Sequence, residues 1–307
     1  MTQKTLPQRL WRRPTAARGY GGYLAPGLLL CLLFLVVPLA MTIGYSFTTW
    51  QGIGDPEWAG LDNYTRLLED DTFWASFRNI GFIILGMAVV PTLLGLMLAA
   101  VLFDHIAKRA PAALVNGLRS GLYLPQVIPV AVTGLMWGWI LAPQGAVNDL
   151  LEAVGLGGLT QNWLGDRDLA LWSVLAVLVW MQLGYPLVLF LAGLQRIDPE
   201  LYEAADLDGA SWFQRFTRIT APLLRPELYV VLVTTTIAGL KVFAQIYVLT
   251  GGGPGDATLV PSYFAYQNFF ERADVGYGSA ISTVMTVMVM AIAAVFLFRQ
   301  NSDDRGM

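Results

Sequence analysis

Long stretches without a charged residue alternate with short polar segments along this chain. Five windows contain no Asp, Glu, Lys or Arg, and a sixth contains only Lys241. Each window exceeds the roughly 20 residues that a helix needs to cross the hydrocarbon core of a bilayer. The pattern therefore predicts an all-α, polytopic membrane helical bundle with six transmembrane helices, near residues 23–45, 80–103, 121–141, 170–193, 228–250 and 276–298.

The first window follows five basic residues, as the apolar core of a secretory signal peptide does. Its apolar run is longer than such a core, and no cleavage site of small residues follows it. Cys31 lies in the middle of the run, which is not the pattern of a lipoprotein cleavage site. We therefore interpret this window as a membrane anchor.

Lys and Arg are distributed unequally between the segments that join the predicted spans. Fourteen lie in the two termini and in segments 104–119 and 194–227, whereas four lie in the other three segments. Cytoplasmic loops carry an excess of Lys and Arg, so both termini are predicted to be cytoplasmic. The chain is thus expected to be a multi-pass protein of the cytoplasmic membrane.

The outer segment 48–78 is long and acidic. Asp62 is expected to cap a short helix over 63–69, and residues 71–78 are expected to lead into the second span.

Composition excludes several classes of function. Only 13% of the residues are charged and 55% are apolar, so too little charge is available to cover a soluble protein of this size. The net charge of −3 gives no basic field for nucleic acid. One Cys and one His exclude a disulfide framework and a histidine metal cluster. We therefore predict no catalytic residue, no metal site and no enzyme.

Two further absences bear on transport. None of the predicted spans contains Asp or Glu, although ion-coupled carriers usually place carboxylates there. The glycines of 251–255 lack the Lys-Ser/Thr of a phosphate loop, so we interpret them as a turn. The chain is expected to bind no cofactor and not to hydrolyse ATP by itself.

The longest predicted cytoplasmic segment, 198–222, begins with the pattern of a short helix. Asp198 suits the N-cap position and Pro199 the first helical position. Gly209 suits the left-handed residue that follows a helix ending near Leu207.

The same segment predicts a second helix, capped by Ser211 and ended by Pro222. Trp212, Phe216 and Ile219 give this helix one apolar face. Three interpretations follow: a linker resting on its own bundle, a helix–turn–helix DNA reader, or a docking element for a basic cleft on a partner. The loop is net negative, which disfavours the DNA reader.

One further pattern runs through this segment, formed by Glu203, Ala204, Ala205, Gly209, Ile219 and Pro222. At these positions it resembles the EAA loop in the permeases of binding-protein-dependent ABC importers. The family usually has Leu before the final proline, where this chain has Ala221. The loop precedes the last two predicted spans, as it does in the family.

Two outer stretches narrow the resemblance to carbohydrate importers. Residues 60–64, with Phe73, Trp74 and Asn79, resemble the outer segment of such permeases, and residues 241–258 resemble the first permease subunit of the maltose and glycerol-phosphate type. The similarity covers roughly residues 20–300 and implies the type I importer permease fold. The expected divisions are a cytoplasmic tail 1–20, a transmembrane permease domain 21–298 with its core at 75–298 and its coupling loop at 198–222, and a cytoplasmic tail 299–307.

The resemblance implies an assembly in which this chain is one half of the channel. Its partners would be a second permease subunit, an ATP-binding cassette ATPase dimer, an extracytoplasmic solute-binding protein and membrane lipid, with no nucleic acid. The partner ATPase would bind ATP and Mg. The family's EAA glutamate pairs with an ATPase arginine, so Glu203 would take that role.

Polar and aromatic side chains within the predicted spans are candidates for a sugar pathway. On a continuous fifth helix, Thr234, Lys241 and Gln245 would share one face. Such side chains also serve helix packing, and Lys241 could instead anchor the helix at the headgroups. The candidates are Lys241, Gln245, Thr234, Gln182, Tyr185, Trp180, Ser282 and Thr286.

The leading hypothesis is the transmembrane permease subunit of an ATP-driven ABC importer for a mono- or oligosaccharide. One alternative is the same machinery with glycerol phosphate or a polyol as its solute. A further alternative is a secondary carrier or channel.

Overall fold

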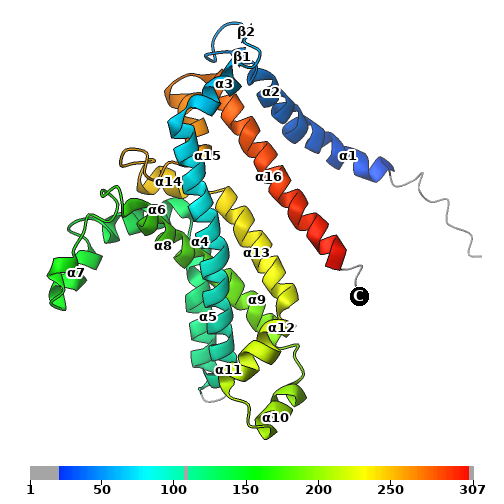
Figure 1. The fold of residues 1–307 in the computed structure, drawn as a ribbon, viewed down its shortest axis with the longest axis vertical. Coiled ribbons are helices and arrows are strands. Elements are labelled where there is room, and N and C mark those ends of the chain that lie inside the picture. Colours follow the sequence, from blue (N-terminus) through cyan, green and yellow to red (C-terminus); the bar gives the residue numbers. More distant parts are fainter. Residues whose placement is uncertain (1–20, 107–109, 304–307) are drawn as a thin grey trace, which may run out of the picture.

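The computed structural model describes residues 21–106 and 110–303. The predicted tail 1–20 and the end of the predicted C-terminal tail, 304–307, lie outside these residues. Within these described residues, four helices are long and apolar enough to cross a membrane alone, and two bent helix pairs raise this number to six if each pair forms one span. We call the end of the molecule that carries helix α10 (Pro199–Leu207) the coupling end (Figure 1). The opposite end carries the hairpin of β1 (Thr48–Thr49) and β2 (Glu57–Trp58).

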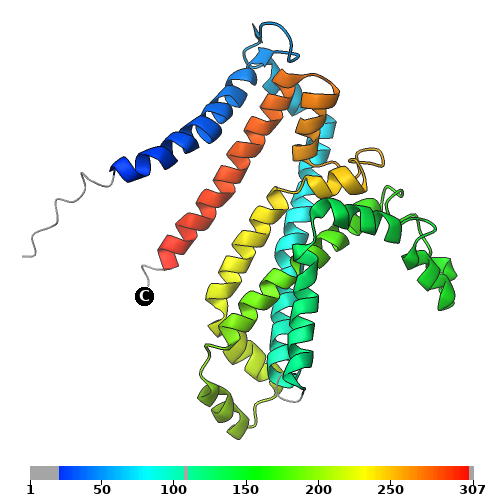
Figure 2. The ribbon, with the colours of Figure 1, turned by 180° about the vertical axis from the view of Figure 1, so that it is seen from behind.

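The first span is a continuous helical segment that lies apart from most of the bundle (Figures 1 and 2). None of its most apolar window is buried. It packs against the last helix near the hairpin end. Its parts are α1 (Gly21–Cys31), a π-helical stretch (Leu32–Val36) and α2 (Val37–Tyr45).

Helix α3 (Asp62–Glu69) follows the hairpin, but Asp62 does not cap it. Asp62 is the first helical residue, and Leu61 occupies the cap position without a side-chain hydrogen bond. The expected cap is therefore wrong by one residue, since the chain already turns into the helix at Leu61. Asp70 does cap the next helix, because its Oδ1 accepts a 2.8 Å hydrogen bond from the backbone N–H of Thr72.

Helix α4 (Asp71–Val101) continues into a π-helical stretch (Leu102–Ile106) and forms the longest span. Residues 71–78 are its first turns, as predicted. The helix packs against α8 (Ala170–Gln182), α9 (Gly184–Leu194), α13 (Arg225–Leu240) and α15 (Pro261–Tyr266), among others. At Gly95 a side chain would meet Pro186 of α9 at 2.6 Å, so only glycine allows this approach.

The predicted third span, 121–141, is not one straight helix. Helix α5 (Ala112–Val127) and helix α6 (Val130–Ile140) meet at an angle of 101°. Ile128 is extended and is followed by Pro129, which is the N-cap residue of α6. A residue before proline avoids the helical region, and this explains the break. Helix α7 (Ala146–Ala153) and a 3₁₀ turn (Gly157–Leu159) then lead to the fourth span, Ala170–Leu194.

The predicted fifth span, 228–250, is also wrong as a continuous helix. Helix α13 ends at Leu240, and helix α14 (Ala244–Leu249) begins after a break. The break is stabilised from α15, where Oγ of Ser262 donates a 2.6 Å hydrogen bond to the carbonyl of Val242. The chain returns through a π-helical stretch (Gln267–Glu271) to the last span, α16 (Val275–Asp303).

Two hydrophobic clusters hold these helices together. One surrounds Ile83, Phe264 and Tyr277 towards the hairpin end, and the other surrounds Phe190 and Leu224 towards the coupling end. Helix α4 contributes to both, so it connects the two ends of the molecule.

Candidate functional site

The predicted coupling helix is present as α10. Oδ1 of Asp198 accepts a 3.0 Å hydrogen bond from the N–H of Glu200, and Pro199 is the first helical residue. The helix ends at Leu207, as predicted, and Gly209 has a φ of +71°. L-residues rarely adopt that conformation, so glycine is needed for the backbone turn itself.

The second predicted helix is also present. Ser211 forms a capping box with Gln214 and begins α11 (Trp212–Arg215), which continues through a π-helical stretch (Phe216–Thr220) into α12 (Ala221–Leu223). The helix therefore ends one residue beyond Pro222, which lies in its last turn instead of ending it. The rings of Trp212 and Phe216 stack with centroids 5.3 Å apart, as the apolar face predicts.

Three side-chain contacts fix this segment in place. Nε1 of Trp212 donates a 3.1 Å hydrogen bond to Oδ2 of Asp104 at the end of the α4 span. Arg215 pairs with Asp206 of α10. The hydroxyls of Tyr202 and Thr220 are 3.0 Å apart, and burial raises the pKa of Tyr202.

A fourth contact joins the helices on either side of the segment. Glu227 of α13 is 6% exposed and pairs with Arg196, just after α9. A buried carboxylate is costly unless it is paired, so this contact fixes the separation of the two helices.

One face of α10, which carries Glu203, Ala204 and Leu207, is exposed. Glu203 and Ala204 are exposed, and Glu203 forms no ion pair within the described residues. Leu207 is 91% exposed, which sequence reasoning missed. Helix α10 lies at the lower end of the molecule in Figure 1, so this face is accessible to a partner.

A central cavity of about 270 Å³ lies between five helices. It brings together three of the predicted pathway residues, Gln182, Lys241 and Gln245. Lys241 is the C-cap residue of α13 and Gln245 lies in α14, so the break in the fifth span brings both to one cavity. The remaining lining residues are Met87, Gln126, Leu178, Met181, Ala238 and Val242.

Gln126 was missed by sequence reasoning. Its Oε1 is buried without a hydrogen-bond partner among the described residues, and the residue lines the central cavity. A buried carbonyl without a partner is costly, so a polar ligand or water is expected to satisfy it. The sequence does single out Gln126, because it is the one amide side chain in the predicted span 121–141 and lies between Pro125 and Pro129.

The other predicted pathway residues lie elsewhere. The hydroxyl of Thr234 donates to the carbonyl of Val230 at 2.8 Å, and that of Thr286 to the carbonyl of Ser282, also at 2.8 Å. Tyr185 packs against the hydrophobic cluster towards the coupling end, and the Trp180 ring contacts Trp137 edge-on at 5.3 Å. Their described contacts are those of helix packing. Thr234 lies one turn before Ala238 on α13, and the part of α13 that lines the central cavity begins at Ala238.

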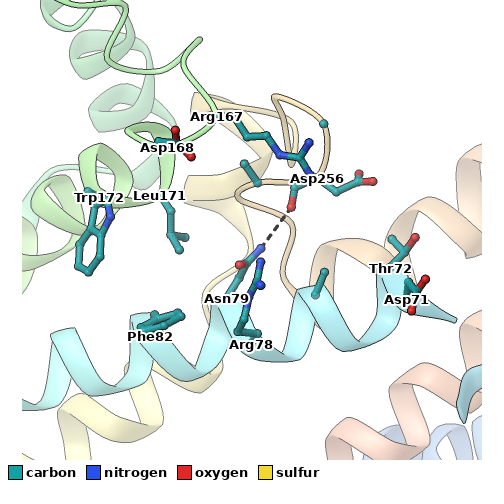
Figure 3. Close-up of a pocket in the computed structure, with 13 residues that line it drawn as sticks. Asp71, Thr72, Arg78, Asn79, Phe82, Arg167, Asp168, Leu171, Trp172 and Asp256 are labelled. Carbon is teal, nitrogen blue, oxygen red and sulfur yellow. Dashed lines mark hydrogen bonds between the residues drawn. The ribbon is translucent and has the colours of Figure 1, made fainter.

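A second, distal cavity of about 490 Å³ lies beside the first turns of α4 (Figure 3). Its walls are α4, the start of α8 and the loop after α14. Arg78 and Asn79 extend from α4 towards Arg167 and Asp256, whereas Phe82 lies on the side of Leu171 and Trp172 (Figure 3). The other lining residues are Asp71, Thr72, Ala75, Asp168, Leu171, Trp172, Gly255 and Ala257.

The sequence of residues 92–305 matches the family model described as the binding-protein-dependent transport system inner membrane component. The chain belongs to this family. The permease is therefore an integral inner-membrane transport component and not an enzyme. Membership of this family excludes the alternative of a secondary carrier or channel.

Relatives match the permease along most of its length. The probable ABC transporter permease YurN of Bacillus subtilis is 37% identical over 273 residues, or 88% of this chain and 92% of that protein. The trehalose/maltose transport permease MalF of Thermococcus litoralis is 37% identical over 281 residues, or 90% and 92%. A bacterial ABC transporter for import of the acidic polysaccharide alginate shares the fold, with a TM-score of 0.77, 24% identity and coverage of 92% and 94%.

Proposed function

We propose that the permease carries a sugar, a mono- or oligosaccharide, through the central cavity as one half of a two-subunit channel. Relatives at 30% identity or more are named for trehalose and maltose, for diacetylchitobiose and for sulfoquinovosyl glycerol. The observation that carries the proposal is the convergence of Lys241, Gln245, Gln182 and Gln126 on one cavity. Amide and ammonium groups donate and accept the hydrogen bonds that sugar hydroxyls need.

An ATPase dimer drives the transport by binding the coupling segment. The exposed carboxylate of Glu203 and the exposed Leu207 would contact a cleft on that partner, and Ala204 and Ala205 allow close approach. Three contacts would transmit movement of α10 to the spans as a rigid body. They are Arg215 with Asp206, Tyr202 with Thr220, and Trp212 with Asp104. ATP and Mg bind to the ATPase, and this chain holds no cofactor.

The orientation follows from the same proposal. The coupling end faces the cytoplasm with both termini, and the hairpin end faces outwards, where an extracytoplasmic solute-binding protein delivers the sugar. A second permease subunit completes the pathway, and lipid surrounds the first span. The proposed permease domain is 21–298, with its core at 75–298.

Lys241 is the one charge among the lining residues of the central cavity, and a cation would also suit a phosphate ester. Glycerol phosphate is therefore the second candidate solute. The test is ATP-dependent uptake by the complex reconstituted with its binding protein, offered maltose, trehalose, lactose or glycerol 3-phosphate. Uptake of a sugar supports the proposal, whereas uptake of glycerol 3-phosphate alone contradicts it.

A further inference from the structure

The distal cavity contains charged groups of both signs that do not pair with one another. Arg78 and Arg167 form no ion pair with any described residue, and neither do Asp71, Asp168 and Asp256. All five side chains are exposed. Guanidinium groups only donate hydrogen bonds and carboxylates only accept them, so the cavity offers both kinds of partner to a ligand.

The balance of charge indicates the class of ligand. The lining holds three carboxylates and two guanidinium groups, so the cavity is net negative and repels a phosphate or another strong anion. A neutral molecule with many hydroxyl groups can donate to the carboxylates and accept from the guanidinium groups at the same time.

Aromatic surface completes the lining. Phe82 and Trp172 are 46% and 58% exposed, and their ring centroids are 6.3 Å apart. Phe82 lies one turn along α4 from Arg78, so one helix presents a charged group beside an aromatic ring. Together the rings provide an apolar surface beside the charged groups, where the carbon-bound hydrogens of a sugar ring can pack.

The loop after α14, which forms the third wall of the distal cavity, is held in position by hydrogen bonds from α4. Asn79 is 2% exposed, and its Nδ2 donates to the carbonyls of Asp256 at 3.2 Å and Leu259 at 2.9 Å. Asp256 has a φ of +65°, a conformation that non-glycine residues adopt only when their surroundings enforce it. The loop after α14 is thus fixed against α4 with the Asp256 carboxylate at the cavity.

We propose that the distal cavity is a second saccharide-binding site, distinct from the central cavity. Its volume lies within the range of about 300–1,000 Å³ typical of small-ligand sites. The proposal rests on the carbohydrate-importing function proposed above. It assigns Trp172, Phe82, Asp168 and Arg167 to direct contact with the sugar.

The test measures saccharide binding by the complete permease–ATPase complex in nanodiscs, without ATP or binding protein. Saturation-transfer NMR with millimolar maltose, trehalose and lactose reports the affinity, and glycerol 3-phosphate is the anionic comparison. Trp172→Leu and Asp168→Asn should each weaken binding about tenfold, because each removes a direct contact. Trp139→Leu is the matched control, since Trp139 is 74% exposed and does not line the cavity.

Several results would overturn the inference. These are no binding of any of the three sugars to the wild-type complex, unchanged affinity in both cavity variants, or glycerol 3-phosphate binding that Trp172→Leu abolishes. In a separate titration of the complex with the binding protein, weaker binding of that protein by Trp172→Leu and Asp168→Asn, with sugar affinity unchanged, would identify a protein-docking surface instead. Lys241→Met separates the two proposals, because it should lower uptake at least about tenfold while sugar binding at the distal cavity persists.

Discussion

The indole of Trp212 in the coupling segment is hydrogen-bonded, at 3.1 Å, to the carboxylate of Asp104, which lies 108 residues earlier at the end of the α4 span. Helix α4 also contributes Met87 to the central cavity. A movement of α10 is therefore connected to the cavity in three steps: the ion pair of Asp206 with Arg215 of α11, the hydrogen bond of Trp212 to Asp104, and helix α4 itself.

Trp212→Phe should uncouple ATP hydrolysis from transport. The phenyl ring preserves the stack on Phe216 but removes the N–H that Asp104 accepts. The ratio of sugar transported to ATP hydrolysed should fall several-fold while the complex stays assembled. Trp139→Phe is the control, and an unchanged ratio in Trp212→Phe would show that this contact carries no coupling.

Glu203→Ala should abolish sugar-stimulated ATP hydrolysis without removing the chain from the membrane. A hydrogen bond to a charged group contributes about 1.5–3 kcal/mol, so the ATPase should bind at least about tenfold more weakly. Glu200→Ala is the matched control, because Glu200 is exposed one turn earlier on the same helix. Gly209→Arg should have the same effect through the strained backbone. Wild-type stimulation in both variants would refute the role of this segment.

Lys241→Met and Lys241→Gln should lower uptake at least about tenfold, because each removes the only charge among the described residues that line the central cavity. Assembly with the ATPase should be unchanged. Thr234→Val serves as the control, since its hydroxyl is bonded to its own helix. Normal uptake kinetics in both Lys241 variants would leave this residue as an anchor at the headgroups.

Tyr277→Phe should destabilise the hairpin end. The Tyr277 hydroxyl donates a 2.6 Å hydrogen bond to Oδ2 of Asp70, and the guanidinium of Arg66 lies 3.9 Å above its ring. Loss of a buried bond to a carboxylate costs about 1.5–3 kcal/mol and should lower the midpoint of thermal unfolding. Tyr123→Phe, at a more exposed tyrosine, should leave that midpoint unchanged.

Membrane orientation can be tested by cysteine labelling, with the single native cysteine first changed by Cys31→Ser. An impermeant reagent applied outside intact cells should label Asp55→Cys and Gly253→Cys, and should leave Asp206→Cys unmodified. Labelling of Asp206→Cys in sealed cells would reverse the proposed orientation.

The coupling segment was predictable because its signals are local. Asp198, Pro199, Gly209 and Ser211 act on the backbone within a few residues, and each occupies its predicted position. The site in the spans was only partly predictable. Hydropathy measures the length of a span but does not locate a break such as Val242, whose carbonyl is satisfied by Ser262 from another helix.

Dependence on tertiary packing also explains why Gln126 and the distal cavity were not predicted from the sequence. Gln126 and the groups of the distal cavity come together only through tertiary packing. Gln182, Lys241 and Gln245 were identified because a polar side chain in an apolar window is itself unusual.

The central claim is that this permease couples ATP hydrolysis to sugar import. The most direct test is accumulation of labelled sugar in proteoliposomes containing the full complex, with binding protein outside and ATP inside. The account predicts accumulation against the gradient for at least one of maltose, trehalose and lactose, dependent on ATP and abolished by Glu203→Ala. Sugar uptake that proceeds equally without ATP, or accumulation that survives Glu203→Ala, would contradict it.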